Sequence, residues 1–439
     1  MERKFLGRVG SNLFKNKMIV GAMLVCLGAV TAACGGKEEK SEAVPTPVIN
    51  NDPAVVKLAG QLSEEEFALF VSALQKKYPH ITLERINTAE KGQAVPELVA
   101  AGIIPDLILA APLNILPFQA LGLYYNVEEL AVKHKLDLNR IKPELLESIK
   151  VGSFADYLVG LPIYNNAFGL FYNKDLFDRF GVSYPKDGMT WEEIRELAAK
   201  LTRTENGVSY YGLHPNSVFW GAYQLGLPFI DTASNKSMFQ SQGWKDLFQM
   251  WQRLYQAGGN VVPKTLAAVK GFQDGQIAMT MGYSSILDAT VKVKDLNWDI
   301  ATYPINPAAP GVGQRVDSIN LVVTAQSKVK DAAFRVVEVI LSEEVQTTLS
   351  RTGKMSVLKD QKIHDQFGQS NTGLQNKNVV ALTKPKLAIV QPFKFPFATN
   401  PATLINNTFN SVIYDQKDIN TALREAEEKV NTDIQLLLK

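Results

Sequence analysis

The chain has 439 residues, of which 46% are apolar and 21% charged, a composition typical of one or two globular domains. The formal net charge is +2, and residues 1–33 carry five Lys or Arg against one Glu, so the rest is slightly acidic. A near-neutral body argues against nucleic acid as a partner, because a basic face would be needed to neutralise phosphates. The only cysteines are Cys26 and Cys34, and the four histidines are scattered. We therefore predict no disulfide in the body, no metal site and no cofactor.

The N-terminus has the pattern of a secretory signal. Residues 1–17 are basic, and residues 18–33 are almost entirely apolar, too short for the roughly 20 residues of a spanning helix. The small residues 31–33 directly precede Cys34. This arrangement resembles the lipobox of bacterial lipoproteins, in which the cysteine receives diacylglycerol and becomes the new N-terminus. Thr31 stands where that family usually has an aliphatic residue. The alternative is a short transmembrane helix with an incidental cysteine.

We therefore predict a signal peptide over 1–33 and a lipidated, flexible tether over 34–52. The tether sequence is small, charged and proline-containing, with few apolar groups to bury. The resulting location is extracytoplasmic, with a lipid anchor in the cell membrane.

The body begins with a strand–helix–strand pattern. VVKLA (55–59) predicts a strand, and SEEEFALFVSALQKKYP (63–79) predicts a helix with a capping box and helical apolar spacing. HITLERI (80–86) alternates like a strand, so the three elements predict a βαβ unit in a parallel sheet. PDLILAAP (105–112) predicts another buried strand, followed by a helix-and-turn connection over 113–131.

The middle of the chain predicts a second set of elements. FGLFYN (168–173) reads as an apolar strand, and KDLFDRFGV (174–182) as a short helix ended by Gly181. Thr190 and Glu193 form a second predicted capping box before an amphipathic stripe.

Residues 160–202, which contain these elements, resemble the extracellular solute-binding proteins of bacterial ABC importers, in particular the sugar-binding family of maltose-binding protein. The family pattern is a Pro, then Leu-x-Tyr-Asn-Lys-Asp-Leu-Phe, a Gly and a Pro, then Thr-Trp-Glu-Glu-Leu. The matching positions here are Pro162, Leu170, Tyr172 to Phe177, Gly181, Pro185 and Thr190 to Ile194. Five further segments match in order, so that the resemblance covers nearly all of 55–435. They are 67–84, 105–110, 272–285, 318–360 and 421–434.

The resemblance implies an α/β fold of two lobes, the type II-like periplasmic-binding-protein fold, with a hinge that the chain crosses several times. The order of the motifs places the crossings near 160–162, 303–304 and 355–358. Ligand would bind between the lobes and the hinge would close over it. Lobe one would hold residues 53–162 and 305–355, and lobe two residues 163–304 and 356–439.

A sugar presents hydroxyls around its edge and C–H groups on its faces, so its site needs polar partners and aromatic rings. The resemblance implies such contacts in the first βα turn, after the Pro-Asp strand, after the first crossing, in 212–226, in 281–285 and at the return strand. The candidate ligand-binding residues are Ser63, Glu64, Asn114, Tyr164, Asn165, Asn216, Trp220, Tyr223, Tyr283 and Asp317.

Each candidate also has a structural interpretation. Ser63 suits a helix cap, asparagines suit turns, and aromatic residues commonly pack in cores. In addition, Ala111 stands where family members often carry an aromatic residue. The sequence therefore does not decide whether lobe one has an aromatic platform on which an oligosaccharide could stack.

The resemblance implies a non-enzymatic, monomeric receptor that captures a sugar or oligosaccharide and passes it to a membrane permease energised by a separate ATPase. No Gly-x-Ser-x-Gly elbow, Walker-type loop or His-Glu-x-x-His motif is present. The alternatives are a non-sugar solute such as a peptide, polyamine or organic acid, a receptor that feeds a membrane sensor, and a secreted glycan-degrading enzyme.

Overall fold

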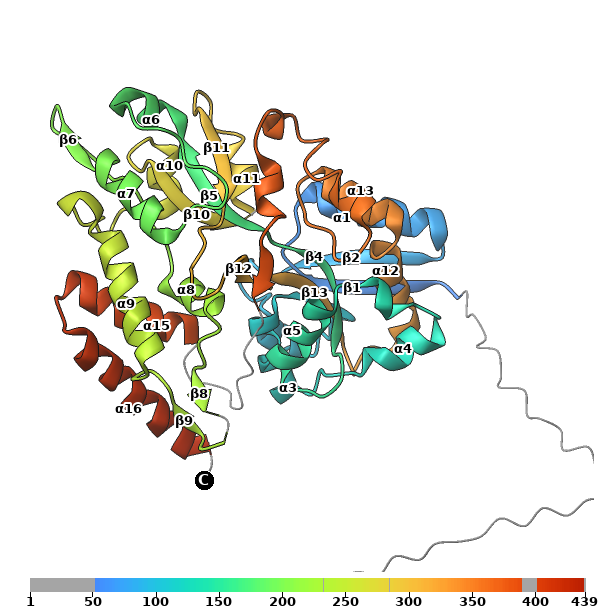
Figure 1. The fold of residues 1–439 in the computed structure, drawn as a ribbon. Coiled ribbons are helices and arrows are strands. Elements are labelled where there is room, and N and C mark those ends of the chain that lie inside the picture. The colour runs from blue at the N-terminus through green and yellow to red at the C-terminus, as the bar shows by residue number, and fades with distance from the viewer. Residues whose placement is uncertain (1–51, 232, 284, 389–400, 438–439) are drawn as a thin grey trace, which may run out of the picture. The chain divides into compact units, whose positions relative to one another are not determined.

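The computed structural model describes residues 52–231, 233–283, 285–388 and 401–437. The predicted signal peptide and Cys34 lie outside these ranges. Within them, no helix is both long enough and apolar enough to cross a membrane. The main sheets belong to the two lobes of an α/β fold (Figure 1).

A five-stranded sheet of order β2-β1-β3-β13-β4 organises the first lobe. Strand β1 pairs in parallel with β2 and β3, whereas β13 runs antiparallel to β3 and β4. Helix α1 (Glu64–Lys77) connects β1 to β2, so the predicted βαβ unit is confirmed. The strands are β1 (Ala54–Gly60), β2 (Ile81–Asn87), β3 (Leu107–Ala110), β4 (Gly160–Asn165) and β13 (Ser318–Val323).

Helices α1, α5 and α12 pack against this sheet, whereas α13 packs on α1 and α12. In α1 the predicted capping box is present, and Phe70 and Leu74 of its apolar stripe are fully buried. Helix α12 returns from late in the chain to pack beside α1. The helical elements are α1 (Glu64–Lys77), α2 (Val95–Ala100), η1 (Pro112–Asn114), α3 (Pro117–Ala120), α4 (Val127–Lys133), η2 (Leu138–Arg140), α5 (Pro143–Ser153), α12 (Lys330–Ile340), α13 (Glu343–Arg351) and α14 (Gln361–His364).

A three-stranded antiparallel sheet of order β10-β5-β11 organises the second lobe. Its central strand β5 is buried along its whole length, as expected for the continuous apolar run FGLFYN. The strands are β5 (Phe168–Asn173), β10 (Met279–Tyr283) and β11 (Trp298–Thr302). Short two-stranded pairs are β6 (Arg203–Glu205) with β7 (Val208–Tyr210), β8 (Ile230–Asp231) with β9 (Lys236–Ser237), and β12 (Val312–Arg315) with β14 (Lys386–Ala388).

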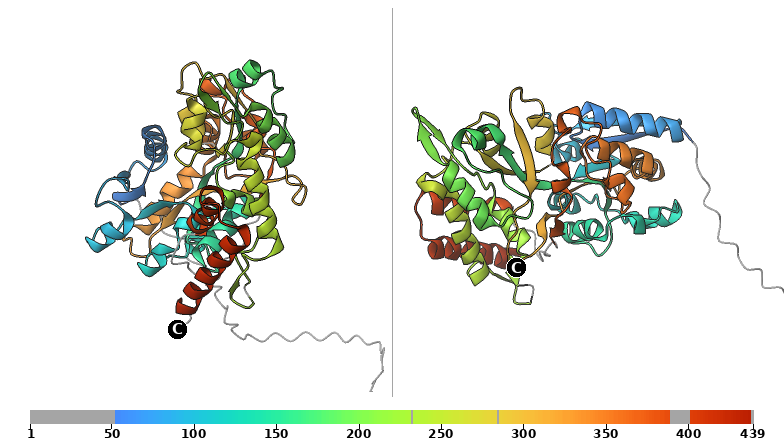
Figure 2. Two further views of the ribbon diagram at one scale, coloured as in Figure 1. Left: turned by 90° about the vertical axis from the view of Figure 1, so that its left-hand side faces the viewer. Right: turned by 45° about the horizontal axis from the view of Figure 1, so that its top comes forward.

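Two of the predicted helix boundaries in this lobe are confirmed. Gly181 ends α6 in the left-handed conformation, with φ of 63°, and Thr190 and Glu193 form the capping box of α7. Helices α15 and α16 pack against each other and against α9 (Figure 2). The helical elements are α6 (Lys174–Phe180), α7 (Trp191–Leu201), α8 (Val218–Gln224), α9 (Gln242–Tyr255), η3 (Ala257–Gly259), α10 (Ala268–Gln273), α11 (Ser285–Thr290), η4 (Thr372–Leu374), η5 (Val379–Leu382), α15 (Pro401–Tyr414) and α16 (Ile419–Leu437).

The hydrophobic cores are built from segments far apart in sequence. One core joins residues between 56 and 164 with residues between 316 and 363. A second joins residues between 168 and 303 with residues between 404 and 434. A smaller third core joins β5 and β11 to residues between 355 and 382. The lobe boundaries stated above stay a prediction, and these cores describe how the chain buries its apolar side chains.

The first passage between the sheets is short. Asn165, at the end of β4, pairs with Ser318 of the first sheet, and Phe168 begins β5 of the second sheet. Only Asn166 and Ala167 lie between the two strands, and both are buried. Phe168 therefore lies at the end of the second sheet that adjoins the first lobe.

Candidate functional site

Polar side chains gather at the carboxyl ends of three parallel strands of the first sheet. Strands β1, β2 and β3 run in the same direction, so the loops that follow them lie at one edge. Ligands of open α/β folds usually bind at such an edge. We call the following residues the polar edge: Ser63 and Glu64 after β1, Arg85, Asn87 and Glu90 at the end of β2, and Asn114 after β3.

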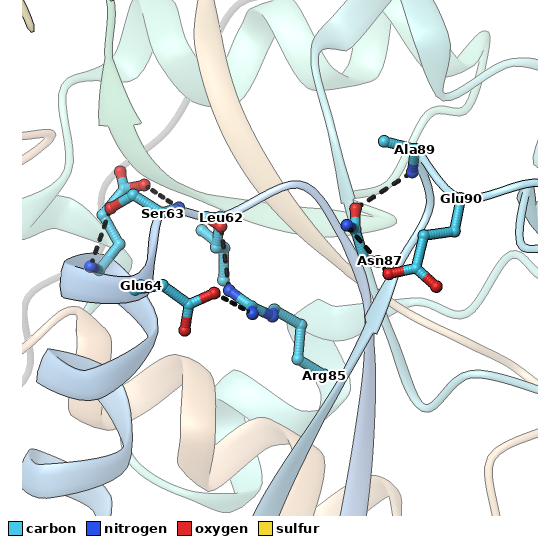
Figure 3. Close-up of polar contacts among 8 residues, drawn as sticks. Leu62, Ser63, Glu64, Arg85, Asn87, Ala89 and Glu90 are labelled. Atoms are coloured by element: carbon cyan, nitrogen blue, oxygen red, sulfur yellow. Dashed lines mark hydrogen bonds and ion pairs between the residues drawn. The ribbon is translucent and has the colours of Figure 1, made fainter.

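Ser63 and Glu64 are engaged by neighbouring groups (Figure 3). The Ser63 hydroxyl accepts the backbone N–H of Glu66 at 3.1 Å, and the Ser63 N–H donates to the Glu66 carboxylate at 2.9 Å. Glu64 forms an ion pair with Arg85, whose guanidinium also donates to the carbonyl of Leu62 at 3.1 Å. Ser63 therefore serves as a helix cap, while the side chain of Glu64 stays 80% exposed at the edge.

The loop after β2 adds residues that the sequence interpretation missed. Asn87 Oδ1 accepts the N–H of Ala89 at 3.2 Å, and its amide donates to Glu90 at 3.4 Å (Figure 3). The sequence could have indicated this residue, because Asn87 directly follows the alternating strand HITLERI and a polar residue at the end of such a strand is a candidate ligand contact. Asn114 lies in the 3-10 turn after β3, and its side chain is exposed.

Three aromatic rings from three elements meet in the second lobe. Phe168 of β5 and Tyr283 of β10 are direct cross-strand partners, with ring centroids 5.6 Å apart. Trp220 of α8 contacts Phe168 edge-on at 5.3 Å and Tyr283 at 6.2 Å. Phe168 is buried, whereas Trp220 and Tyr283 are partly exposed. We call Phe168, Trp220 and Tyr283 the aromatic trio.

The structure brings together two predicted residues, Trp220 and Tyr283, and adds Phe168. The sequence interpretation had assigned Phe168 only to a buried strand, because a continuous apolar run does not reveal which of its residues packs under partly exposed rings. Tyr223 takes a different place from Trp220. It is 3% exposed and packs against Phe219 and Phe229 in the core, because α8 is buried on nearly every side except at Trp220.

Asn216 shapes the turn that leads into α8. Its backbone has a φ of 63°, and its side-chain amide donates to the carbonyl of Met281 at 3.1 Å. Its N–H donates to Nδ1 of His214 at 3.0 Å, and its carbonyl accepts the hydroxyl of Tyr255 at 3.1 Å. Burial lowers the pKa of His214 to about 4, so this imidazole is neutral at pH 7. Asn216 thus connects α8 to the strand that carries Tyr283.

The predicted residues next to the passage between lobes form a hydrogen-bonded cluster. The Asn165 carboxamide oxygen accepts the N–H of Asp317 at 3.0 Å, and the Asn166 amide donates to the Asp317 carboxylate at 3.0 Å. Asn165 also donates its N–H to the carbonyl of Met355 at 2.9 Å. The cluster therefore joins three passages of the chain, and Asn165 is almost completely buried.

Tyr164 and α1 lie next to this cluster. Tyr164 is 7% exposed, and the Lys354 ammonium lies 5.5 Å from its ring centroid. The same ammonium is 3.9 Å from the Glu66 carboxylate, within the capping box of α1. The first turn of α1 and the segment before Met355 are therefore in electrostatic contact. Among residues 52–437 as far as they are described, no group of His, Cys, Asp or Glu has the arrangement of a metal site.

Comparison with known proteins identifies the family. Residues 70–369 match the model of the bacterial extracellular solute-binding proteins, and the chain belongs to this family. Members of the family are non-enzymatic binding components that act outside the cytoplasm. The match spans well over half of the chain.

Individual relatives are distant in sequence. A multiple sugar-binding protein of Streptococcus mutans is 24% identical over 183 residues, which are 40% of this chain and 39% of that protein. The fold is shared with an ABC substrate-binding protein of Listeria monocytogenes in complex with cycloalternan. That structure is 18% identical, with a TM-score of 0.71 over 87% of this chain and 99% of the other. A Mycobacterium tuberculosis protein in complex with glycerophosphocholine is 14% identical, with a TM-score of 0.70 and coverage of 87% and 99%.

Proposed function

We propose that this solute-binding protein captures a sugar or oligosaccharide between its lobes and delivers it to a membrane permease driven by a separate ATPase. The observation that carries the proposal is the aromatic trio at the end of the second sheet that adjoins the first lobe. Two partly exposed rings on a buried third ring form a rigid apolar surface. The C–H face of a pyranose ring has a matching shape and polarity.

The polar edge supplies the groups that the rim of a sugar needs. The Glu64 carboxylate, the Asn87 amide and the Asn114 amide offer both acceptors and donors to hydroxyl groups. Because Glu64 is largely exposed and held by one ion pair, a ligand hydroxyl can share it. In this proposal the sugar face rests on Trp220 and Tyr283, and the sugar edge faces the first lobe.

The other predicted residues act in support. Ser63 holds the first turn of α1, and Asn216 holds the turn before α8. Tyr164, Asn165 and Asp317 hold the passages between lobes, where bending would accompany closure. Tyr223 lies on the buried face of α8 and packs against Phe229. A ligand that contacts both lobes stabilises the closed form only by its preference for that form over the open one. The closed receptor, a monomer, then docks on the permease.

Lipid attachment at Cys34 completes the proposal. Cys34 follows small residues after a short apolar segment, and the family acts outside the cytoplasm. The test is labelling of the full chain with a palmitate analogue, followed by membrane fractionation. C34S is expected to lose the label and the membrane while keeping ligand affinity. A variant that stays in the membrane without label would instead favour an uncleaved helix.

Names of similar proteins support a saccharide, since the Streptococcus mutans relative is a multiple sugar-binding protein and the Listeria neighbour holds cycloalternan. A second candidate ligand is an organic solute with a polar head, because the same fold in Mycobacterium tuberculosis holds glycerophosphocholine. A membrane sensor in place of the permease would use the same closure.

The decisive experiment is calorimetric titration of the C34S protein with mono- and oligosaccharides, peptides, polyamines and glycerophosphodiesters. Thermal unfolding of the same mixtures gives an independent measure, because a ligand at a hundred times its Kd adds about 2.7 kcal/mol to the free energy of unfolding. Binding of a saccharide that W220A weakens would support the proposal. Binding of another class alone, with no response to any saccharide, would refute it. Deletion of any permease genes encoded beside the receptor gene, with loss of saccharide uptake as the readout, separates transport from sensing.

A further inference from the structure

The turn that leads into α8, residues 214–217, contains an unusual hydrogen bond. The N–H of Asn216 donates to Nδ1 of His214 at 3.0 Å, so a side chain accepts a backbone donor two residues later. This is the geometry of an Asx turn, in which Asp or Asn normally supplies the acceptor. Here the imidazole nitrogen takes the place of the carboxamide oxygen.

Hydrogen bonds connect this turn to β10 and to Tyr255 of α9. The backbone of His214 bridges to Thr280 of β10, and its N–H donates to the carbonyl of Met279 at 2.9 Å. The Tyr255 hydroxyl donates to the carbonyl of Asn216 at 3.1 Å, and its ring contacts the imidazole edge-on at 5.5 Å. Asn216 adopts the left-handed conformation, which asparagine tolerates better than most residues other than glycine, and several specific contacts hold it there.

The same turn connects two members of the aromatic trio. Tyr283 lies three residues after Thr280 on β10, and Trp220 lies four residues after Asn216 on α8. Asn216 donates its side-chain amide to the carbonyl of Met281, two residues before Tyr283. The direction in which α8 leaves the sheet, and with it the place of Trp220, depends on this turn.

We propose that His214 is a positioning residue, whose unprotonated Nδ1 sets the turn before α8 and thereby the place of Trp220 against Tyr283. The inference rests on the proposed function, in which Trp220 and Tyr283 contact the ligand. It assigns one tautomer to His214, with the hydrogen on Nε2. The lowered pKa of His214 agrees with an acceptor role for the neutral ring.

A matched pair of variants tests which atom of His214 matters. His214→Asn places a carboxamide oxygen close to the position of Nδ1 and restores an ordinary Asx turn. His214→Gln places its amide near the position of Nε2 and leaves the Asn216 N–H without its acceptor. At pH 7 we expect saccharide affinity close to that of the unchanged protein for His214→Asn, and about five- to tenfold weaker for His214→Gln.

Acrylamide quenching gives a readout that needs no ligand. Trp220 is the partly exposed tryptophan, whereas Trp191, Trp244, Trp251 and Trp298 are buried. Displacement of α8 in His214→Gln should raise the quenching constant, and W220F should remove that difference. His214→Asn should match the unchanged protein. If no saccharide binds to the unchanged protein, the proposed function fails, and quenching still decides the role of His214.

Two outcomes would overturn the inference. Equal affinity and quenching in both variants and the unchanged protein would show that the turn does not need Nδ1. Equal loss in both variants would assign His214 to packing against Tyr255, since both substitutions remove the ring. For a variant that does not fold, imidazole nitrogen NMR of the unchanged protein supplies the answer. A protonated Nδ1 on His214 at pH 7 would overturn the assignment.

Discussion

The polar edge of the first lobe and the aromatic trio of the second lobe are built in different ways. At the polar edge, side chains bond mainly to close neighbours in sequence, as Ser63 does with Glu66 and Asn87 with Glu90. Such contacts are exposed, and water competes with each of them. The rings of the trio come from β5, α8 and β10, and they rest on a buried core.

This difference predicts a division of tasks in binding. The trio is held before ligand arrives, so little conformational entropy is lost when a sugar face settles on it. The polar edge has freely exposed groups such as Glu64, which adjust to the hydroxyls of the ligand. The predictions below test this contrast, from the largest expected effect to the smallest.

Removal of the buried Phe168 ring should destabilise the aromatic trio. Phe168→Ala leaves a cavity under Trp220 and Tyr283, and we expect the free energy of unfolding to fall by about 3 kcal/mol, with loss of saccharide binding. The matched control is Phe67→Ala in the first lobe, where a half-buried ring lies under Arg85. Urea denaturation should show a clearly smaller loss for the control. Equal losses would remove the contrast between the two regions.

Acid should lower the free energy of unfolding through His214, which precedes α8 in the second lobe. The pKa of His214 is about 4 in the folded chain, below the ordinary value of 6.5, because burial disfavours the charged ring. Between these values the unfolded chain binds the additional proton, so stability falls as pH falls from 6.5 to 4. The expected loss is roughly 2 to 3 kcal/mol. Urea denaturation of the unchanged protein and of His214→Asn gives the difference in their free energies of unfolding, and the pH dependence of this difference measures the contribution of His214. A difference that stays constant from pH 7 to 4 would contradict the prediction.

Loss of an exposed ring should reduce affinity without unfolding the chain. For Tyr283→Ala we expect about tenfold weaker saccharide binding, equivalent to about 1.4 kcal/mol, with a small change in Tm. Tyr184→Ala is the control, since Tyr184 is a half-buried ring of the same lobe that contacts Tyr172 and Phe177. Calorimetric titration of both variants gives the comparison. Unchanged affinity in Tyr283→Ala would remove Tyr283 from the site.

The smallest effect belongs to the polar edge. Glu64→Gln removes the ion pair to Arg85 but keeps a hydrogen-bonding group, so we expect only about two- to threefold weaker binding. The difference from the unchanged protein should shrink in 0.5 M salt, because exposed charges are screened. A tenfold or salt-independent loss in the same titration would show that Glu64 is as firmly placed as the trio.

Much of the local structure was predictable from the sequence. The capping boxes at Ser63 and Thr190, the helix end at Gly181 and the βαβ unit depend on residues within a few positions of one another, and all four are confirmed. The family was also predictable, because its motifs occur in order along the chain, and the match over residues 70–369 confirms it.

The candidate site was predictable only in part, because its parts come from distant segments. Trp220 and Tyr283 were chosen for their place in family motifs, but their contact through Phe168 depends on the pairing of β5 with β10, more than a hundred residues apart. Trp220 and Tyr223 are aromatic residues of the same short segment, and the sequence does not show which of them is exposed. The packing of α8 buries Tyr223 and leaves Trp220 partly exposed.

The amino-acid sequence by itself determined the elements of this protein and the order in which they occur, since caps, apolar periodicity and glycine ends act over short distances. Only the tertiary structure decided what those elements do together. It joined Asn165, Asp317 and Met355 into one cluster, and it connected Asn216, in the turn before α8, to Met281 and Tyr255. These contacts arise from burial and chain reversal, which bring together groups that no short stretch of sequence contains.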